Sequence, residues 1–175
     1  WCSRFCPGLS LCNGQLSWWP PIAFKKIASV CNGELTLLKI FNRVDVLGGG
    51  VYQSGKYMEN VFTGMLRLTS LNLPVKRILL LGLGAGSCLK AIFRRFPHAH
   101  VVAVERDPTM IELCRVWSLP SVPRQRVEII CGDLVDRLET LSGEFDLILI
   151  DVFDGANVSE AVTLPEVRRA LKSML

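Results

Sequence analysis

The stretch that decides the fold is residues 77–86, with the sequence RILLLGLGAG. Its first half is a short apolar run, which is typical of a buried parallel strand. Glycines at alternate positions, Gly82, Gly84 and Gly86, then provide a tight turn, and residues 87–96 have a helical pattern. A glycine turn between a strand and a helix lets a ligand lie against bare backbone. The stretch therefore predicts a nucleotide- or nucleoside-binding α/β fold.

Downstream of this stretch, predicted strands and helices alternate. The strands fall at 101–104, 127–131 and 145–150, and the helices at 108–117, 134–141 and 165–174. Alternation of this kind implies right-handed βαβ crossovers and a doubly wound, Rossmann-like parallel sheet. Ligands of such sheets bind beyond the carboxyl ends of the strands, so polar residues at those ends are candidate site residues.

The region before the glycine turn has a different pattern. Residues 34–40 and 44–47 flank the dipeptide Asn42-Arg43 and predict a β-hairpin, and residues 56–71 predict a helix. We therefore divide the chain into an irregular or poorly ordered segment at 1–32, a small β-hairpin region at 33–55 and a Rossmann-like nucleoside-binding catalytic domain at 56–175.

Composition excludes several classes of function. The chain has 175 residues, a formal net charge of +4 and no block of five or six like charges, so we expect no nucleic-acid partner. No run of 18 apolar residues is present, so we expect no membrane partner. The N-terminal cysteines, Cys2, Cys6, Cys12 and Cys31, lack paired C-x-x-C spacing. We expect free thiols in a reducing cytoplasm and no metal site.

Two strand ends carry acids that suit a nucleoside. Glu105 ends the second strand, where a carboxylate can accept hydrogen bonds from a ribose diol. Asp107 can cap the helix that starts at Pro108, and direct contact with the cofactor is its second interpretation. Gly132 and Asp133 follow the third strand, where the carboxylate can accept from the adenine amine or cap the next helix.

Two more acids follow the fourth strand. Asp151 and Asp154 lie in the sequence Ile-Asp-Val-Phe-Asp-Gly, at residues 150–155. A pair of carboxylates at the rim of a parallel sheet can bind a cationic amine or accept its proton. The alternative interpretation is a simple acidic turn.

The glycine spacing favours one cofactor class over another. Enzymes of hydride transfer use G-x-G-x-x-G, whereas Ser87 stands where the third glycine of that motif would be. S-Adenosylmethionine or its decarboxylated form needs no pyrophosphate cradle, but it does use one acid for ribose and one for adenine. We therefore favour a nucleoside that carries a sulfonium.

At this point residues 48–155 resemble the spermidine synthase branch of the class I S-adenosylmethionine-dependent transferases. The matching pieces are VYQSG at 51–55, LGLGAG at 81–86, ERD at 105–107, GD at 132–133 and IDVFD at 150–154. The resemblance implies that Gln53 and the glycine loop line the nucleoside site. It also implies that Glu105 binds ribose, that Asp133 binds the adenine amine, and that Asp151 and Asp154 handle the amine substrate.

The resemblance further implies aminopropyl transfer to a small-molecule amine, a homodimer in the full-length protein, and a sheet that is truncated at the C-terminus of this sequence. Two departures bear on the reaction. Ala85 stands where the family has an aspartate for the amine of the decarboxylated cofactor, and Phe62 stands at the ungapped position of a tyrosine for the diamine. They favour two alternatives, a methyltransferase of unknown substrate and a non-catalytic module that retains the fold.

Overall fold

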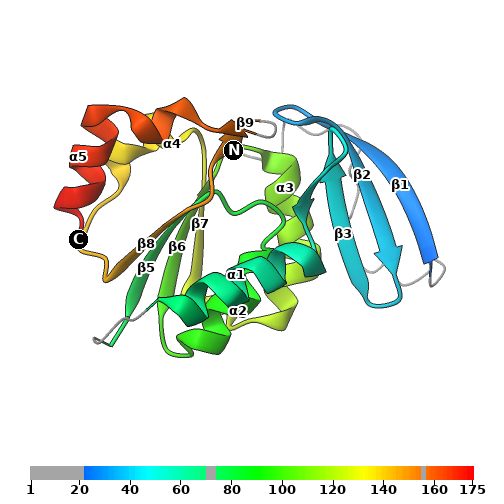
Figure 1. The fold of residues 1–175 in the computed structure, drawn as a ribbon, viewed down its shortest axis with the longest axis horizontal. Coiled ribbons are helices and arrows are strands. Elements are labelled where there is room, and N and C mark those ends of the chain that lie inside the picture. Colours follow the sequence, from blue (N-terminus) through cyan, green and yellow to red (C-terminus); the bar gives the residue numbers. More distant parts are fainter. Residues whose placement is uncertain (1–21, 70–73, 155–156) are drawn as a thin grey trace.

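A computed structural model describes residues 22–69, 74–154 and 157–175. In the described residues, two four-stranded β-sheets stand side by side, with helices packed around the C-terminal one (Figure 1). Residues 1–21, which contain Cys2, Cys6 and Cys12 and most of the predicted irregular segment, lie outside the described residues.

The C-terminal sheet is parallel, as predicted. It contains β5 (Arg77–Leu81), β6 (His100–Glu105), β7 (Val127–Cys131) and β8 (Leu147–Ile150) in the order β7-β6-β5-β8. The strands are in register along their length, and Leu81 lies beside Val104 on one side and Ile150 on the other. All four strands therefore end at the same rim.

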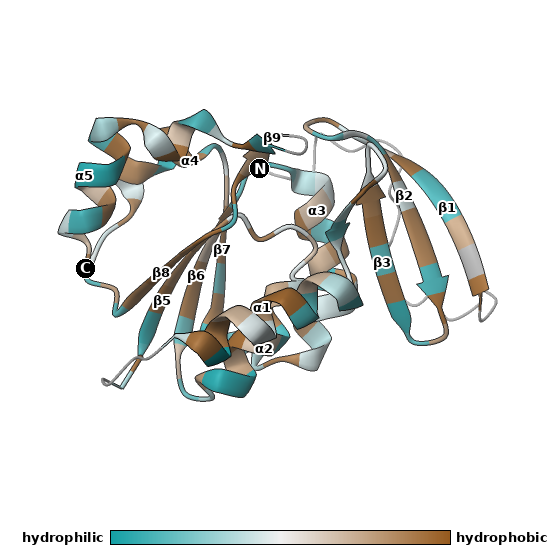
Figure 2. Cartoon of the chain, in the orientation of Figure 1, coloured by the Kyte–Doolittle hydropathy of each residue, from teal (hydrophilic) through white to brown (hydrophobic). Residues whose placement is uncertain are grey.

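Helices cover both faces of this sheet (Figure 1). α1 (Lys56–Leu68) and α2 (Ser87–Arg95) lie on one face, and α4 (Leu134–Arg137) and α5 (Pro165–Ser173) lie on the other. Alternate side chains of β5 serve the two faces: Ile78 and Leu80 pack in the cluster with α1 and α2, whereas Leu79 and Leu81 pack with α4 and α5. Because both faces are buried, the strands are apolar almost throughout (Figure 2).

Several connections between the strands of the C-terminal sheet contain short irregular helical turns. α3 (Pro108–Leu113) continues into a π-helical turn (Cys114–Ser118), so the helix expected to run to about residue 117 is only partly α-helical. Short 3-10 turns follow at Leu119–Ser121, Arg124–Arg126, Leu138–Thr140 and Glu160–Thr163. A two-residue hairpin of β9 (Phe153–Asp154) and β10 (Asn157–Val158), which the sequence pattern did not predict, lies beyond β8.

The N-terminal sheet is larger than predicted. The hairpin of β2 (Gly33–Ile40) and β3 (Arg43–Gly48) is confirmed, but β1 (Ile22–Ser29) and β4 (Val51–Ser54) flank it in a four-stranded antiparallel sheet. The expectation of irregular structure was therefore wrong for residues 22–29. The overlooked signal is the dipeptide Asn32-Gly33, which favours a tight hairpin turn between β1 and β2. The proposed domain division at residue 55 stays a prediction.

An apolar cluster joins the two sheets. Ile27, Leu35, Leu37 and Val46 of the N-terminal sheet pack against Ala85 of the glycine loop and against α3. None of the helices in the described part of the chain has the length and hydrophobicity needed to span a bilayer.

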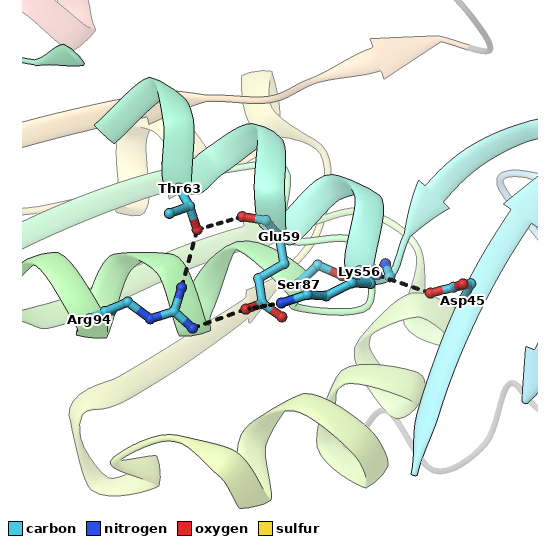
Figure 3. Close-up of polar contacts among 7 residues, drawn as sticks. Asp45, Lys56, Glu59, Thr63, Ser87 and Arg94 are labelled. Atoms are coloured by element: carbon cyan, nitrogen blue, oxygen red, sulfur yellow. Dashed lines mark hydrogen bonds and ion pairs between the residues drawn. The ribbon is translucent and has the colours of Figure 1, made fainter. Parts of the chain in front are cut away.

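A buried carboxylate ties α1 to α2 (Figure 3). Glu59 accepts hydrogen bonds from Lys56 Nζ and Arg94 Nη2, each at 3.0 Å. Burial raises the pKa of Glu59, but the two hydrogen bonds outweigh burial and leave the pKa below its ordinary value of 4.5. Glu59 is therefore held as a charged group at neutral pH.

Replacing Glu59 tests this connection. We expect Glu59→Gln to lower the free energy of unfolding by about 1–2 kcal/mol at pH 7, because both charge-assisted hydrogen bonds weaken. A depressed pKa contributes stability above the ordinary value that is lost as the pH falls through the folded value, so the difference should shrink near pH 3.5. Urea denaturation at both pH values measures it. Glu112→Gln, at an exposed pair with Arg115, is the control and should change stability by less than about 0.5 kcal/mol.

Candidate functional site

A cavity of about 640 Å³ opens between the N-terminal sheet and the rim of the parallel sheet. Its wall combines residues of β4 and α1 with residues that follow β5, β6, β7 and β8. The structure brings together most of the site residues predicted from the sequence on this wall: Gln53, Gly82, Gly84, Glu105, Gly132, Asp133 and Asp151. Gly86 and Asp107 are not among the described residues that line the cavity, and the side chain of Asp154 lies outside the described residues.

The glycine loop is shaped by close approaches on both sides. Gly82 has a φ of 87°, and a Cβ there would lie 2.1 Å from the backbone oxygen of Asp151. Only glycine at this position therefore allows the segments that follow β5 and β8 to lie so close together. At Gly86 a Cβ would lie 2.5 Å from Cys114 Sγ, so this glycine allows packing against the π-helical turn and does not face the ligand.

Glu105 lines the cavity and also supports the glycine loop through hydrogen bonds to its backbone. Its Oε2 accepts hydrogen bonds from the N–H groups of Leu83 at 3.0 Å and Gly84 at 2.7 Å, and its Oε1 accepts from Asp107 N at 2.9 Å. Burial raises the pKa of Glu105, and the three N–H donors oppose that effect. A carboxylate has about four lone-pair positions, so roughly one remains for a ligand hydroxyl, and it lies on Oε1.

Asp107 serves the structure. The side chain is fully buried, and Oδ1 caps α3 by accepting from Thr109 N at 2.8 Å. Oδ2 accepts from Ser29 and Asn32, which belong to the end of β1 and the turn that follows it. Its oxygens are thus engaged away from the cavity, and the geometry favours the interpretation as a helix cap over direct contact with the cofactor.

Asp133 combines both of its predicted roles at one position. Oδ1 caps α4 by accepting from Val135 N at 2.9 Å, while the exposed side chain lines the cavity. Gly132 has a φ of 152°, and a Cβ there would lie 2.2 Å from Arg137 Nε. The glycine therefore lets the chain turn so that Asp133 faces the cavity, with Oδ2 available for an amine donor.

Asp151 directly follows β8, an outer strand of the described parallel sheet, and it lines the cavity beside Gly82. Burial, followed by the negative charge of Glu105, raises its pKa to about 6. A carboxylate with that pKa is ionised at neutral pH and is more basic than an ordinary aspartate, which suits a general base. Asp154 is described through its backbone, which pairs with Asn157 in the β9–β10 hairpin, and its side chain lies outside the described residues.

Several cavity residues were not predicted from the sequence. Asn32 reaches the wall from the β1–β2 turn, and Phe153 reaches it from β9. The rings of Tyr52 and Tyr57, from β4 and the first turn of α1, have centroids 5.8 Å apart and both side chains line the cavity. The two tyrosines are only five residues apart in the sequence, with Gly55 between them. The sequence alone does not show that β4 and α1 turn both rings toward the cavity.

The two residues expected to distinguish the reactions lie in the core. Ala85 is 4% exposed and packs between the N-terminal sheet and α3, and Phe62 is 6% exposed on the buried side of α1. Neither lines the cavity. Ala85 therefore does not face the cavity, contrary to what the resemblance implies, whereas Tyr57 does line it.

This placement leads to a stability prediction. We expect Ala85→Asp to lower the free energy of unfolding by about 2 kcal/mol or more, because the new carboxylate enters an apolar cluster without a partner. Ala161→Asp, which adds the same charge at the wall of the cavity, is the matched control and should be much milder. Thermal or urea unfolding of the two variants measures the difference. Equal losses would show that the loop turns Ala85 toward the cavity.

A family model described as a methyltransferase domain matches residues 78–174. The chain belongs to the methyltransferase domain family. A polyamine aminopropyltransferase of Chromobacterium violaceum is 35% identical over 88 residues, which is 50% of this chain and 34% of that protein. An eEF1A lysine and N-terminal methyltransferase of Mus musculus is 36% identical over 80 residues, 43% of this chain and 11% of that protein.

Comparison with solved structures gives the same fold. A probable spermidine synthase from Corynebacterium glutamicum aligns with a TM-score of 0.68 at 22% identity, over 90% of this chain and 61% of that one. This methyltransferase domain therefore has the spermidine synthase-like form of the class I S-adenosylmethionine-dependent fold, including the N-terminal antiparallel sheet. The chain spans 34% and 39% of the length of the first two curated relatives it matches.

Proposed function

We propose that this chain binds S-adenosylmethionine or its decarboxylated form and transfers a carbon group from the sulfonium to an amine. One observation carries the proposal: Glu105, Asp133 and Asp151 line the same cavity as the bare glycine loop. The families of the curated relatives, polyamine aminopropyltransferases and protein methyltransferases, support a transferase of this kind.

The residues present fit such a nucleoside. Oε1 of Glu105 would accept one ribose hydroxyl, Oδ2 of Asp133 would accept from the adenine amine, and Gly84 offers backbone without a side chain. When bound, the cofactor supplies an electrophilic carbon and a neutral thioether as leaving group. The task of the protein is then to orient the nucleophile and to remove its proton.

Asp151 is the group that would remove the proton. Its raised pKa, about 6, matches a base that works near neutral pH. Tyr57 and Phe153 border the same cavity and provide aromatic faces for an ammonium group. The described lining residues include three carboxylates and one guanidinium, that of Arg106. This excess of negative charge favours a cationic substrate and the doubly cationic decarboxylated cofactor.

Methyl transfer is the second candidate, and two comparisons favour it. The matching family model is described as a methyltransferase domain, and an eEF1A lysine and N-terminal methyltransferase is among the curated relatives. Ala85 is buried and does not line the cavity, so it does not supply the counter-charge that the family resemblance places beside the amine of the decarboxylated cofactor.

Calorimetric titration separates these reactions. The protein is titrated with S-adenosylmethionine, its decarboxylated form and methylthioadenosine. Tighter binding of the decarboxylated form supports aminopropyl transfer, and tighter binding of S-adenosylmethionine supports methyl transfer. Failure of all three to bind would contradict the proposed function and favour a non-catalytic module.

A further inference from the structure

The junction between β4 and α1 forms one wall of the cavity. Gln53, at the end of β4, and Tyr57, in the first turn of α1, both line it. The backbone oxygen of Gln53 would lie 3.4 Å from a Cβ on Gly84, so this wall touches the glycine loop directly. The position of the junction therefore decides how wide the cavity is beside the loop.

A single hydroxyl holds the junction against the loop. Ser87 directly follows Gly86, and its Oγ accepts a hydrogen bond from Gly55 N at 2.6 Å. The same Oγ shares a second hydrogen bond with the hydroxyl of Ser54, a side chain that is 3% exposed. Ser87 stands where the dinucleotide motif would have its third glycine, and a glycine there would leave both groups without this partner.

A carboxylate of the N-terminal sheet secures the next amide. Asp45 Oδ1 accepts from Lys56 N at 2.9 Å (Figure 3). Gly55 has a φ of 129°, and a Cβ there would lie 2.2 Å from Asp45 Oδ1, so the junction has no room for a side chain. The first backbone N–H groups of α1 have no acceptor within the helix, and Gly55 has no side chain to cap them. Side chains from β3 and α2 accept their hydrogen bonds instead.

We infer that Ser87 is a positioning residue: its hydroxyl sets Gln53 and Tyr57 against the glycine loop and so sets the affinity of the cavity for its nucleoside. This inference rests on the proposed function. Ser87 itself does not line the cavity, so it acts through the backbone of the junction. It also gives a physical reason for serine at this position.

The test compares three variants of the chain. Ser87→Ala removes the hydroxyl, and Ser87→Thr keeps it. Ser173→Ala is the matched control, because Ser173 in α5 donates to Ala170 O at 2.7 Å and is not among the described residues that line the cavity. Calorimetry with S-adenosylhomocysteine gives the dissociation constant, and amide hydrogen exchange at Gly55 and Tyr57 reports on the junction.

We expect Ser87→Ala to raise the dissociation constant about five- to tenfold, the scale of one or two lost hydrogen bonds, and to speed exchange at Gly55. Ser87→Thr should recover most of both effects, and Ser173→Ala should show neither. Unchanged exchange, or faster exchange with unchanged affinity, would overturn the positioning role. If the wild-type protein binds neither S-adenosylhomocysteine nor methylthioadenosine, the proposed function fails, while exchange at Gly55 and Tyr57 still decides whether Ser87 positions the junction.

Discussion

Asp151→Asn is expected to lower turnover by about 10²- to 10⁴-fold, the usual effect of removing a general base. Affinity for S-adenosylhomocysteine should stay within a few-fold, because the amide keeps the size of the side chain and Asp151 is assigned to the amine. Asp136→Asn, an exposed acid in α4, is the control and should leave turnover unchanged. Turnover that survives intact in Asp151→Asn would remove Asp151 from the mechanism.

The pH dependence of Asp151 provides an independent check. Because its pKa is raised to about 6, the wild-type rate should fall as the pH drops through that value, and the fall should be absent in Asp151→Asn. The effect on stability has the opposite direction. A carboxyl whose folded pKa lies above the unfolded value of 3.8 contributes stability at low pH that is lost as the pH rises through about 6.

Asp151→Asn should therefore gain stability relative to the wild type as the pH rises. We expect the change between pH 4 and pH 7.5 to be on the order of 1–2 kcal/mol in favour of the variant, after allowance for solvent screening. Urea denaturation at the two pH values measures it. A variant that loses activity and gains stability at neutral pH would show that the buried charge serves the chemistry and opposes the fold.

Glu105→Ala is expected to give the largest loss of stability, about 3–5 kcal/mol. Three backbone N–H groups, those of Leu83, Gly84 and Asp107, lose their acceptor, and each unsatisfied buried donor costs about 1–3 kcal/mol before water enters. Relief of the burial of one carboxylate offsets part of this. The variant should also bind no nucleoside, since the glycine loop loses its support.

Glu105→Gln separates the two effects. The amide oxygen can still accept from Leu83 and Gly84, but its NH₂ group faces the N–H of Asp107, so we expect a loss of about 1 kcal/mol in stability. Nucleoside affinity should fall by about 1.5–3 kcal/mol, because a hydrogen bond to a charged acceptor is lost. Calorimetry and urea denaturation measure the pair. An unchanged affinity would mean that Glu105 only supports the loop.

Much of the fold follows from local patterns that the structure preserves. The apolar strand before Gly82 and the Asp107-Pro108 helix start both form as the sequence predicts, because burial on two faces and an N-cap are local requirements. β1 was missed because Ile22 and Phe24 are exposed on the outer face of the sheet, so the strand lacks a clean alternation. The π-helical turn after Leu113 depends on packing against Gly86, a contact between distant parts of the sequence.

Site residues could be predicted from the sequence where they follow the carboxyl end of a parallel strand, and not elsewhere. Glu105, Asp133 and Asp151 reach one cavity because parallel strands end together. Asn32 is held by its hydrogen bond to Asp107, and Tyr57 follows the junction that Ser87 and Asp45 hold, so both placements depend on contacts between distant parts of the sequence. Ala85 was misassigned because its side chain packs in the apolar cluster with Leu113 and Val46, contacts between parts of the chain that are distant in sequence.

The hydrogen bonds from Ser29 and Asn32 to Asp107 have a consequence for how the molecule can be divided. Asp107 N donates to Glu105, so the turn after β1 is connected through two carboxylates to the glycine loop. The N-terminal sheet is therefore part of the structure that forms the cavity. The smallest piece that retains a competent site should begin at β1, and the two sheets should melt in one cooperative transition.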